Sequence, residues 1–524
     1  MKRLLYIFIL VFGILISNTG CKKFLAEKSQ DLIKPSTVQD LTALMAGEAY
    51  PYQTNLHLLL NMVTDDITCN GGQGQATYQS TVLSGKAPFT WSKNMYQELL
   101  QPGGIASTTY LDSWQILYKR IAGCNVVLAY ADQVTGATAD KQNLKGQALA
   151  LRAYYYFILV NLYGKPYNAP GADPATSPGV PLKLTMEVTD ELFKRNSVAE
   201  VYTQIELDLK NAATILMNYP EDNGVYKMSE TAVYTLLSRM YLYEEKWALA
   251  VEYANKGLAK KSTLTQLGSF GAINYNNYNV NTVGNNLDRI YDPATSAEVI
   301  WAYVPITGNG AEGQFLKSSL IPNYNLTRNP PYAVSPDLLN LYDSKGVDAN
   351  DTYIGDLRPR LYFNCAAILV GFIPPSTGVF TYKSYAGGMG GSGIRVAELY
   401  MNRAEANIQQ FMSTGNDALR VSALQDLNTL RMSRYDTRQT YVPVNITDKT
   451  QLLNFYRDER RREFPFDGHR WFDLRRYGMP SISHFYQEVA GTGETFTLAQ
   501  GDSRYTFPIP QEVLDRNGEL TQNP

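Results

Sequence analysis

The chain has 524 residues, of which 44% are hydrophobic and 18% are charged, a balance that excludes a disordered or collagen-like chain. Lys and Arg total 47 against 49 for Asp and Glu, so the net charge is −2 and the basic excess typical of nucleic-acid-binding proteins is absent. Only three histidines occur, which argues against a histidine-built metal site. We therefore expect no nucleic-acid partner, no metal and no other cofactor.

The first twenty residues have the form of a signal peptide. Lys2 and Arg3 precede residues 4–16, which carry no charge. That stretch is shorter than the roughly 20 apolar residues that span a bilayer as a helix, and small residues follow it. Residues 17–21 read SNTGC and resemble a bacterial lipobox, whose cysteine is acylated. We predict a lipoprotein signal peptide over residues 1–20 and a lipid on Cys21, which attaches the protein to the membrane; the alternative is a plain secretory signal with a chance cysteine.

Most of the remaining chain carries the helical period. Between residues 143 and 164, apolar groups recur three or four residues apart, and Gly164 and Pro166 then stop the helix. Similar patterns occupy about 110–133, 197–218, 229–260, 394–412, 416–435 and 448–464. Strand signals are short, at residues 298–303 and 379–382. The sequence predicts an all-α dominated fold with long irregular loops and a few short strands.

One stretch has the spacing of a tetratricopeptide hairpin, in which large residues of one helix meet small residues of the next. Its members are Tyr234, Leu237, Ser238, Tyr241, Ala250, Ala254 and Gly257. A single unit cannot bury its own apolar face, so other helix pairs must stack on it. We expect the helix at residues 144–162 to supply part of that stack.

Three long loops are rich in glycine, asparagine and aromatic residues. They cover residues 67–109, 262–298 and 304–336. Loops of this length without secondary structure are uncommon unless they bind something. The alternative is solvated coil packed on the helices.

Signals for catalysis are weak. Residues 388–393 fit G-x-G-x-x-G, but the β/α alternation of a dinucleotide-binding fold is missing around them, so we interpret them as a loop. Asp65 and Asp66 are adjacent, so their side chains diverge and cannot flank one glycosidic bond; a hydrogen-bonding or structural role is expected. After Cys21, the cysteines Cys69, Cys124 and Cys365 are widely spaced and indicate neither a disulfide framework nor zinc, and Cys124 is expected to be a buried apolar residue. We expect no catalytic residues and no enzyme.

Residues 457–478, RDERRREFPFDGHRWFDLRRYG, give the sharpest signal. They predict a charged helix that ends near residue 464, a turn at Gly468, and a second short element with Trp471, Phe472 and Leu474 pointing inward. Arginines alone would suggest phosphate binding. Because carboxylates are interleaved with them and arginine forks match carboxylates, an internal ion-pair network is favoured.

This segment resembles the SusD/RagB family of outer-membrane nutrient-binding lipoproteins. The matching residues are Glu459, Arg460, Arg461, Glu463, Phe464, Asp467, Gly468, Arg470, Phe472, Asp473, Leu474 and Arg476, with Asp467 where the family usually has Glu. Further ordered matches are Trp114, Tyr118, Ile121, Cys124, Asn125, residues 152–157 and 162–164, Arg395, residues 397–398, 400–401 and 403–406, Leu427, Asn428, Arg431, and residues 507–510 and 522–524. Residues 22–110 and 262–390 match poorly.

The resemblance implies a SusD-like scaffold of tetratricopeptide-like helix hairpins with a loop-built ligand surface. Residues 21–260 would form its N-terminal region, and residues 261–524 its C-terminal region with a loop-rich ligand-binding insert. It implies a surface-exposed, lipid-anchored outer-membrane protein that binds a glycan or other large nutrient and delivers it to a SusC-like TonB-dependent transporter. Lys22 and Lys23 stand where an acidic export cluster is often found, which weakens the inference of surface exposure.

Sugar rings lie flat on indole and phenol rings, and their hydroxyls need amide or carboxylate partners. The loops supply both kinds, so we predict ligand contacts at Asp66, Trp91, Tyr275, Asn276, Asn277, Tyr278 and Tyr324. The alternative to ligand contact is that each aromatic ring packs its loop against the core. The alternative function is a secreted glycan-active hydrolase, which needs two carboxylates about 5–9.5 Å apart in a cleft. A third hypothesis is a lipoprotein with only a scaffold role, which should lack a grouped set of exposed aromatic residues.

Replacing Cys21 with Ala should release the mature protein from the membrane, because the acyl chain is its expected anchor. Membrane fractionation and fatty-acid labelling of the two forms measure this. Unchanged retention together with unchanged labelling would contradict the lipid prediction.

Overall fold

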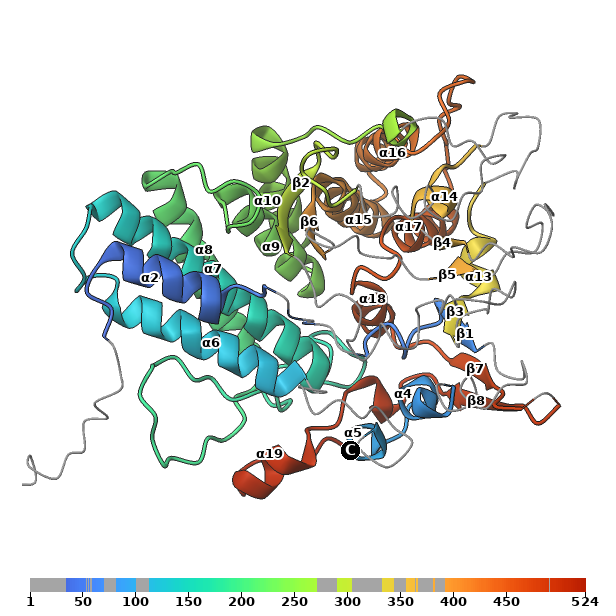
Figure 1. Ribbon diagram of the computed structural model, residues 1–524. Coiled ribbons are helices and arrows are strands. Elements are labelled where there is room, and N and C mark those ends of the chain that lie inside the picture. Colours follow the sequence, from blue (N-terminus) through green and yellow to red (C-terminus); the bar gives the residue numbers. More distant parts are fainter. Residues whose placement is uncertain are drawn as a thin grey trace, which may run out of the picture.

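The computed structural model describes most of the chain after the signal segment. The described residues are 34–52, 54, 56, 59–69, 82–99, 113–270, 290–303, 332–343, 355–362, 364–365, 380–381, 392–489 and 491–524. Helices dominate them and the strands are short, so the predicted fold class is confirmed (Figure 1). The predicted signal peptide and Cys21 lie outside the described residues.

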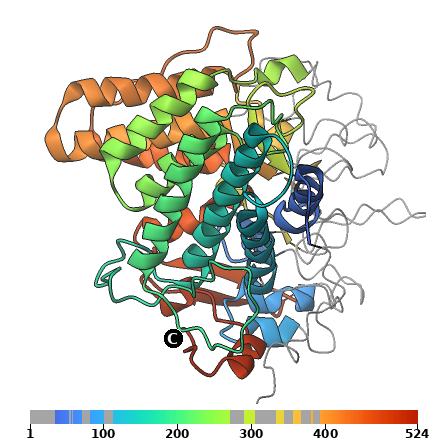
Figure 2. The same cartoon turned by 90° about the vertical axis from the view of Figure 1, so that its left-hand side faces the viewer.

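The long helices form one continuous stack. They are α6 (Ser113–Tyr130), α7 (Thr138–Tyr163), α8 (Val198–Asn218), α9 (Glu230–Tyr243), α10 (Trp247–Lys260), α15 (Val396–Thr414), α16 (Asp417–Met432) and α17 (Lys449–Glu463). Each of α6 to α10 packs against the next, α10 continues onto α15, and α15 packs against α16 and α17 (Figure 2). Every predicted helical stretch is present; the pattern over 229–260 is interrupted at residues 244–246 and forms two helices.

The α9–α10 hairpin has the predicted tetratricopeptide-like contacts. The Ser238 hydroxyl donates to the Ala250 carbonyl oxygen at 2.9 Å, and the Tyr241 and Tyr253 rings stack with centroids 5.5 Å apart. A Cβ on Gly257 would lie 2.7 Å from the Leu399 side chain. Gly257 therefore lets α10 approach α15 closely, which joins the first helix pairs to the C-terminal ones.

Local sequence explains where several helices begin and end. The Ser197 hydroxyl accepts from the Glu200 amide while the Glu200 carboxylate accepts from the Ser197 amide, a capping box that starts α8. The Asp448 carboxylate caps α17 in a similar way through the Gln451 amide. Gly415 ends α15 in the left-handed conformation, which glycine adopts without a side-chain clash.

The shorter elements lie around this stack. The helical ones are α2 (Val38–Leu44), η1 (Met45–Ala49), α4 (Lys86–Phe89), α5 (Met95–Leu99), η2 (Leu267–Phe270), α13 (Pro336–Leu339), α14 (Arg358–Tyr362), α18 (Arg470–Arg476), η3 (Ser503–Tyr505) and α19 (Gln511–Arg516). The antiparallel strand pairs are β1 (Ile67–Cys69) with β3 (Tyr332–Val334), β2 (Val299–Tyr303) with β6 (Ser392–Arg395), β4 (Asn364–Cys365) with β5 (Phe380–Thr381), and β7 (Ile482–Tyr486) with β8 (Glu494–Leu498). The two predicted strands coincide with β2 and β5.

Gly393 is the last glycine of the G-x-G-x-x-G stretch, and it has a structural role in β6. Its φ is +149°, and a Cβ there would lie 1.9 Å from the Trp301 carbonyl oxygen. The pairing of β2 with β6 therefore requires glycine at this position. Residues 388–391 lie outside the described part of the chain.

The core centres on α7, whose C-terminal half is buried on all sides. Its one buried cation, Arg152, makes a bidentate pair with Asp208 through two contacts of 2.8 Å. Cys124 of α6 is fully buried, as expected for a small apolar side chain. Within the part of the chain that the structure describes, no helix combines the length and apolarity needed to cross a membrane.

The arginine-rich segment of α17 is confirmed as an internal ion-pair network. The Glu463 carboxylate accepts from three arginines of other elements: Arg395 at 2.8 Å, Arg434 at 2.9 Å and Arg358 at 3.2 Å. All four side chains are fully buried. Burial alone would raise the pKa of Glu463, but Arg434 and Arg395 outweigh it and hold that pKa at about 2.

Two further carboxylates extend the network. Glu459 accepts from Arg358 at 2.7 Å and from Arg462 at 2.9 Å, and it also contacts Arg431. Glu298 accepts from Arg395 at 2.7 Å and from Arg434 at 2.9 Å. The network thus joins β2, β6, α14, α16 and α17. In α18, Trp471, Phe472 and Leu474 are buried as predicted.

The adjacent pair Asp65–Asp66 faces this segment. Arg470 makes a bidentate pair with Asp65 at 2.8 and 2.7 Å, and Arg461 donates to Asp66 at 2.7 Å. Burial opposes the ionisation of Asp65, but the hydrogen bond and charge of Arg470 lower its pKa to about 2. The structural role predicted for these two acids is therefore present.

Replacing Arg470 with Ala should lower the free energy of unfolding by about 3 kcal/mol, because Asp65 would keep a half-buried charge without its partner. Thermal melts followed by circular dichroism measure this, with the exposed, unpaired Arg516→Ala as the matched control. Because the folded-state pKa of Asp65 lies below its unfolded value, the pair stabilises at neutral pH and this contribution should be lost as the pH falls from about 4 to about 2.

In a double-mutant cycle, Asp65→Asn with Arg470→Ala should destabilise by clearly less than the sum of the single variants. Additive losses, or an Arg470→Ala melt equal to that of wild type, would show that the pair does not stabilise the fold.

Candidate functional site

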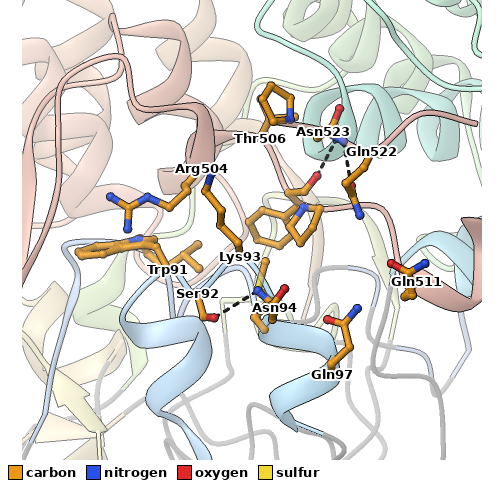
Figure 3. Close-up of a pocket in the computed structure, with 15 residues that line it drawn as sticks. Trp91, Ser92, Lys93, Asn94, Gln97, Arg504, Thr506, Gln511, Gln522 and Asn523 are labelled. Atoms are coloured by element: carbon orange, nitrogen blue, oxygen red, sulfur yellow. Dashed lines mark hydrogen bonds between the residues drawn. The ribbon is translucent and has the colours of Figure 1, made fainter.

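A cavity of about 310 Å³ lies beside Trp91 (Figure 3). Its walls come from three parts of the chain: the turn at Val63, residues 91–97 at the start of α5 and just before it, and, far away in sequence, residues 504–524. The lining residues are Val63, Trp91, Ser92, Lys93, Asn94, Met95, Gln97, Arg504, Thr506, Phe507, Pro508, Gln511, Gln522, Asn523 and Pro524.

Trp91 has a backbone conformation that bulky residues rarely adopt. Its φ is +54°, in the left-handed region. The surrounding structure enforces it: the Trp91 amide donates to the Pro88 carbonyl at 3.2 Å, and the indole Nε1 donates to the Val63 carbonyl at 2.9 Å. Strained residues of this kind persist where neighbours fix them and cluster at binding sites, which marks this cavity as a candidate site.

One face of the Trp91 ring is covered by His484 of β7. The imidazole lies between Phe89 and Trp91, with ring centroids 4.1 and 4.2 Å away, and its nitrogens face the carbonyl oxygens of Phe89 and Thr64. Burial lowers the pKa of His484, while the two carbonyl oxygens that face its nitrogens oppose this shift. Trp91 is only 3% exposed and offers the cavity little of its ring surface.

Amide side chains dominate the polar lining. Asn523 donates to the Phe507 carbonyl at 2.7 Å and Gln522 donates to the Ile509 carbonyl at 2.8 Å, so these two fix the C-terminal wall. The side-chain amides of Asn94 and Gln97, on the opposite wall in Figure 3, make no hydrogen bond within the described part of the chain. They are available to donate to and accept from a ligand.

The cavity carries few charges. Arg504 is held by Asp502 through contacts of 2.7 and 3.0 Å, and Lys93 is exposed at the rim. The described lining includes no carboxylate side chain. The pair of acids that a glycosidase needs is therefore not among these residues.

The structure describes two of the seven predicted ligand residues. Asp66 is 1% exposed, pairs with Arg461, and does not line the cavity; burial raises its pKa. Trp91 does line it. The turn at residues 63–66 joins the two, because the Val63 carbonyl accepts from Trp91. The predicted residues Tyr275, Asn276, Asn277, Tyr278 and Tyr324 lie outside the described residues.

Sequence reasoning missed most of the cavity. Asn94 and Gln97 lie in the loop that was expected to bind ligand, but nothing in their spacing distinguishes them. Phe507 and Gln522 were noted only as part of a C-terminal pattern, and no local signal places them against residue 91. Their contribution depends on contacts between segments about 400 residues apart.

Comparison with known families accounts for both halves of the chain. A family model described as "Starch-binding associating with outer membrane" matches residues 53–242, and the model of the SusD family matches residues 381–524. The chain belongs to the SusD/RagB family. The first match begins within the stretch that the sequence motifs left unmatched.

Individual relatives agree with this assignment. A SusD-like protein of Formosa agariphila is 24% identical over 458 residues, covering 80% of both chains. The starch-binding protein SusD of Bacteroides thetaiotaomicron is 32% identical over 130 residues, which is 25% of this chain and 20% of that protein.

Solved structures show the same fold. A SusD-like carbohydrate-binding protein of Bacteroides vulgatus has a TM-score of 0.62 at 21% identity, covering 93% of this chain and 97% of its own. A laminarin-binding SusD-like protein has a TM-score of 0.54 at 19% identity, covering 93% of this chain and 97% of its own.

Proposed function

We propose that the protein binds a glycan or oligosaccharide at the outer membrane and passes it to a SusC-like TonB-dependent transporter. The observation that carries the proposal is the amide-lined cavity beside Trp91, with no carboxylate side chain among its described lining residues, on a SusD-type helical scaffold. The relatives named for starch and laminarin binding support the ligand class.

The chemistry of the lining suits a sugar. Sugar hydroxyls both donate and accept hydrogen bonds, as do the free amides of Asn94 and Gln97. Half-buried Pro508 provides apolar surface for the C–H faces of the ring, whereas Met95 and Phe507 are almost fully buried in the cavity wall. A volume of about 310 Å³ is at the lower end of ligand pockets, so the cavity fits a short part of a longer chain.

The remaining ligand surface is proposed on the loops, with Tyr275, Asn276, Asn277, Tyr278 and Tyr324 as contacts. The membrane attachment is proposed through a lipid on Cys21, supported by the outer-membrane description of the matching family model. The protein is proposed to be a binding protein and not an enzyme. A glycan-active hydrolase is the alternative, and turnover of a bound oligosaccharide would reveal it.

Replacing Asn94 or Gln97 with Ala should weaken binding of a matching oligosaccharide about fivefold each, because one hydrogen-bonding group is lost. Calorimetric titration with starch- and laminarin-derived oligosaccharides measures this. Asn454→Ala, an exposed amide of α17 away from the cavity, is the matched control.

In the same titrations, loss of a central ring such as Tyr275, Tyr278 or Tyr324 should cost about thirtyfold. If the amide variants bind as wild type does, the cavity is not part of the glycan site. If the ring variants fold and bind within twofold of wild type, the loop platform is wrong.

A transporter partner should co-purify with the protein in mild detergent, since a lasting complex needs a total buried interface of about 2,000 Å² or more. A pull-down from native membranes with mass spectrometry tests this. Recovery of the protein alone at high yield would contradict the proposed delivery step.

A further inference from the structure

A second, larger cavity lies at the junction of α9, α10, α15, α17 and α18, and these elements can be located in Figure 1. Its volume is about 600 Å³, well within the range of small-ligand sites. No residue of the Trp91 cavity lines it, so the two cavities are separate. Tyr167 and Trp247, both half-buried, provide ring surface, while Asn168, Gln409 and Ser413 provide hydroxyl and amide groups.

Arg475 of α18 lines this cavity and has no carboxylate partner within the described chain. It is 2% exposed, and its hydrogen bonds go to the Gly164 carbonyl and, at 3.5 Å, to the Thr506 hydroxyl. Its Nε and Nη1 atoms have no partner. Burial lowers the pKa of Arg475 to about 10, with only tyrosines near enough to oppose it. A buried guanidinium without a counter-charge is costly, and an anion in the cavity would offset that cost.

The neighbouring arginine shows the contrast. Arg476 is paired with Glu405 at 2.7 Å and with Asp473 at 2.9 Å, so it belongs to the internal ion-pair network. It also fills the arginine position of the pattern Phe-Asp-Leu-x-Arg, whereas Arg475 stands at the unspecified position. The uncompensated charge is therefore separate from the residues that carry the family pattern.

Arg457 of α17 supplies a second free cation on the same wall. It is half-buried and makes no hydrogen bond or ion pair with any described residue. Its guanidinium carbon lies over the Tyr477 ring, 4.5 Å from the centroid, a contact that does not use its N–H groups. A planar guanidinium held in this way is ready to bind an oxyanion in bidentate geometry.

Glu245 stands at the edge of the same cavity in a strained conformation. Its φ is +58°, at the turn between α9 and α10, where glycine or asparagine would be less costly. Its carboxylate makes no ion pair among the described residues. The described lining thus carries two uncommitted cations and one uncommitted carboxylate, which leaves it net positive, with the Glu245 carboxylate able to accept from hydroxyl groups.

We propose that this cavity binds an acidic sugar unit, one that carries a carboxylate or a sulfate, with the anionic group at Arg457 near Arg475, the ring against Trp247 or Tyr167, and hydroxyls toward Glu245. The proposal rests on the proposed function in that the ligand is a saccharide. It adds a second subsite, chemically distinct from the neutral Trp91 cavity.

Calorimetric titration of the purified protein with glucuronate, glucose 6-sulfate and glucose tests the proposal. Both acids should bind at least about tenfold more tightly than glucose, since charge-assisted hydrogen bonds to the anion are absent with glucose. Arg457→Gln should weaken both acids about tenfold and leave glucose unchanged, while the exposed Arg516→Gln, outside both cavities, should change nothing. Preference for one acid over the other identifies carboxylate or sulfate as the natural group.

A second variant guards against misfolding. Arg475→Met removes a buried cation that pairs with no described carboxylate, so its melting temperature should equal or exceed that of wild type. Glucuronate should raise the melting temperature of wild type and not that of Arg475→Met. Inorganic sulfate should compete more weakly than glucose 6-sulfate, because it lacks the ring.

The proposal would be overturned by equal affinity for glucose and both acids, by an Arg457→Gln variant that binds the acids as wild type does, or by no binding of either acid at about 10 mM. Equal competition by inorganic sulfate would also overturn it, since the sugar ring would then play no part. If acidic sugars do not bind but neutral oligosaccharides do, and Asn94→Ala weakens that neutral binding, the proposal of a second subsite is wrong and the proposed function still holds. If acidic sugars bind to the second cavity but no neutral glycan binds to the protein, only the assignment of the Trp91 cavity as a glycan site is contradicted.

Discussion

The carboxylate of Glu463 is the interaction on which the C-terminal half depends. Three fully buried arginines from β6, α14 and the end of α16 converge on it, and Glu298 and Glu459 complete their coordination. Transferring a single such ion from water to a dry interior costs of the order of 20 kcal/mol before relaxation, so an incomplete set would destabilise the fold strongly. The network therefore admits one arrangement of these elements, and that arrangement fixes where α17 ends and α18 begins.

Residues 457–478 also connect the ion-pair network to the Trp91 cavity. Arg461 and Arg470 hold Asp66 and Asp65, and those acids end a turn whose carbonyl oxygens accept from the Trp91 indole and contact His484. The left-handed backbone at Trp91 is thus held by a chain of contacts that begins in the ion-pair network. This explains how a loop between two short helices keeps a strained conformation next to a cavity.

The sequence predicted what depends on local order and missed what depends on distant contacts. Periodicity placed α8 within one residue because Ser197 and Glu200 cap it, and the tetratricopeptide-like spacing over 234–257 correctly predicted two helices without giving the exact position of the turn near Glu245. The interleaved charges of α17 predicted ion pairing correctly, although most partners lie on other elements: Arg462 pairs within the helix with Glu459, whereas Arg460 and Arg461 pair with acids outside it. The aromatic ring of Trp91 makes it a candidate from the sequence alone. Asn94 and the opposite wall at Gln511 cannot be predicted in this way, because no sequence spacing relates segments about 400 residues apart.

Buried arginines have two different roles in this molecule. Those that pair with a carboxylate stabilise the fold, and those without such a partner among the described residues line a cavity. Arg358, Arg395 and Arg434 are fully buried, and each forms ion pairs with buried glutamates that stabilise the fold. Arg475 is as deeply buried and unmatched within the described chain, beside a cavity that also presents the unpaired Arg457. An uncompensated charge destabilises the folded protein, so retaining it is reasonable where a ligand supplies the missing anion. The Trp91 cavity has the opposite character, since its Arg504 is already paired with Asp502 and free amides remain. One chain thereby presents one cavity whose polar lining is mainly of amides and another with uncompensated cations, and a glycan with both plain and acidic units would match the pair.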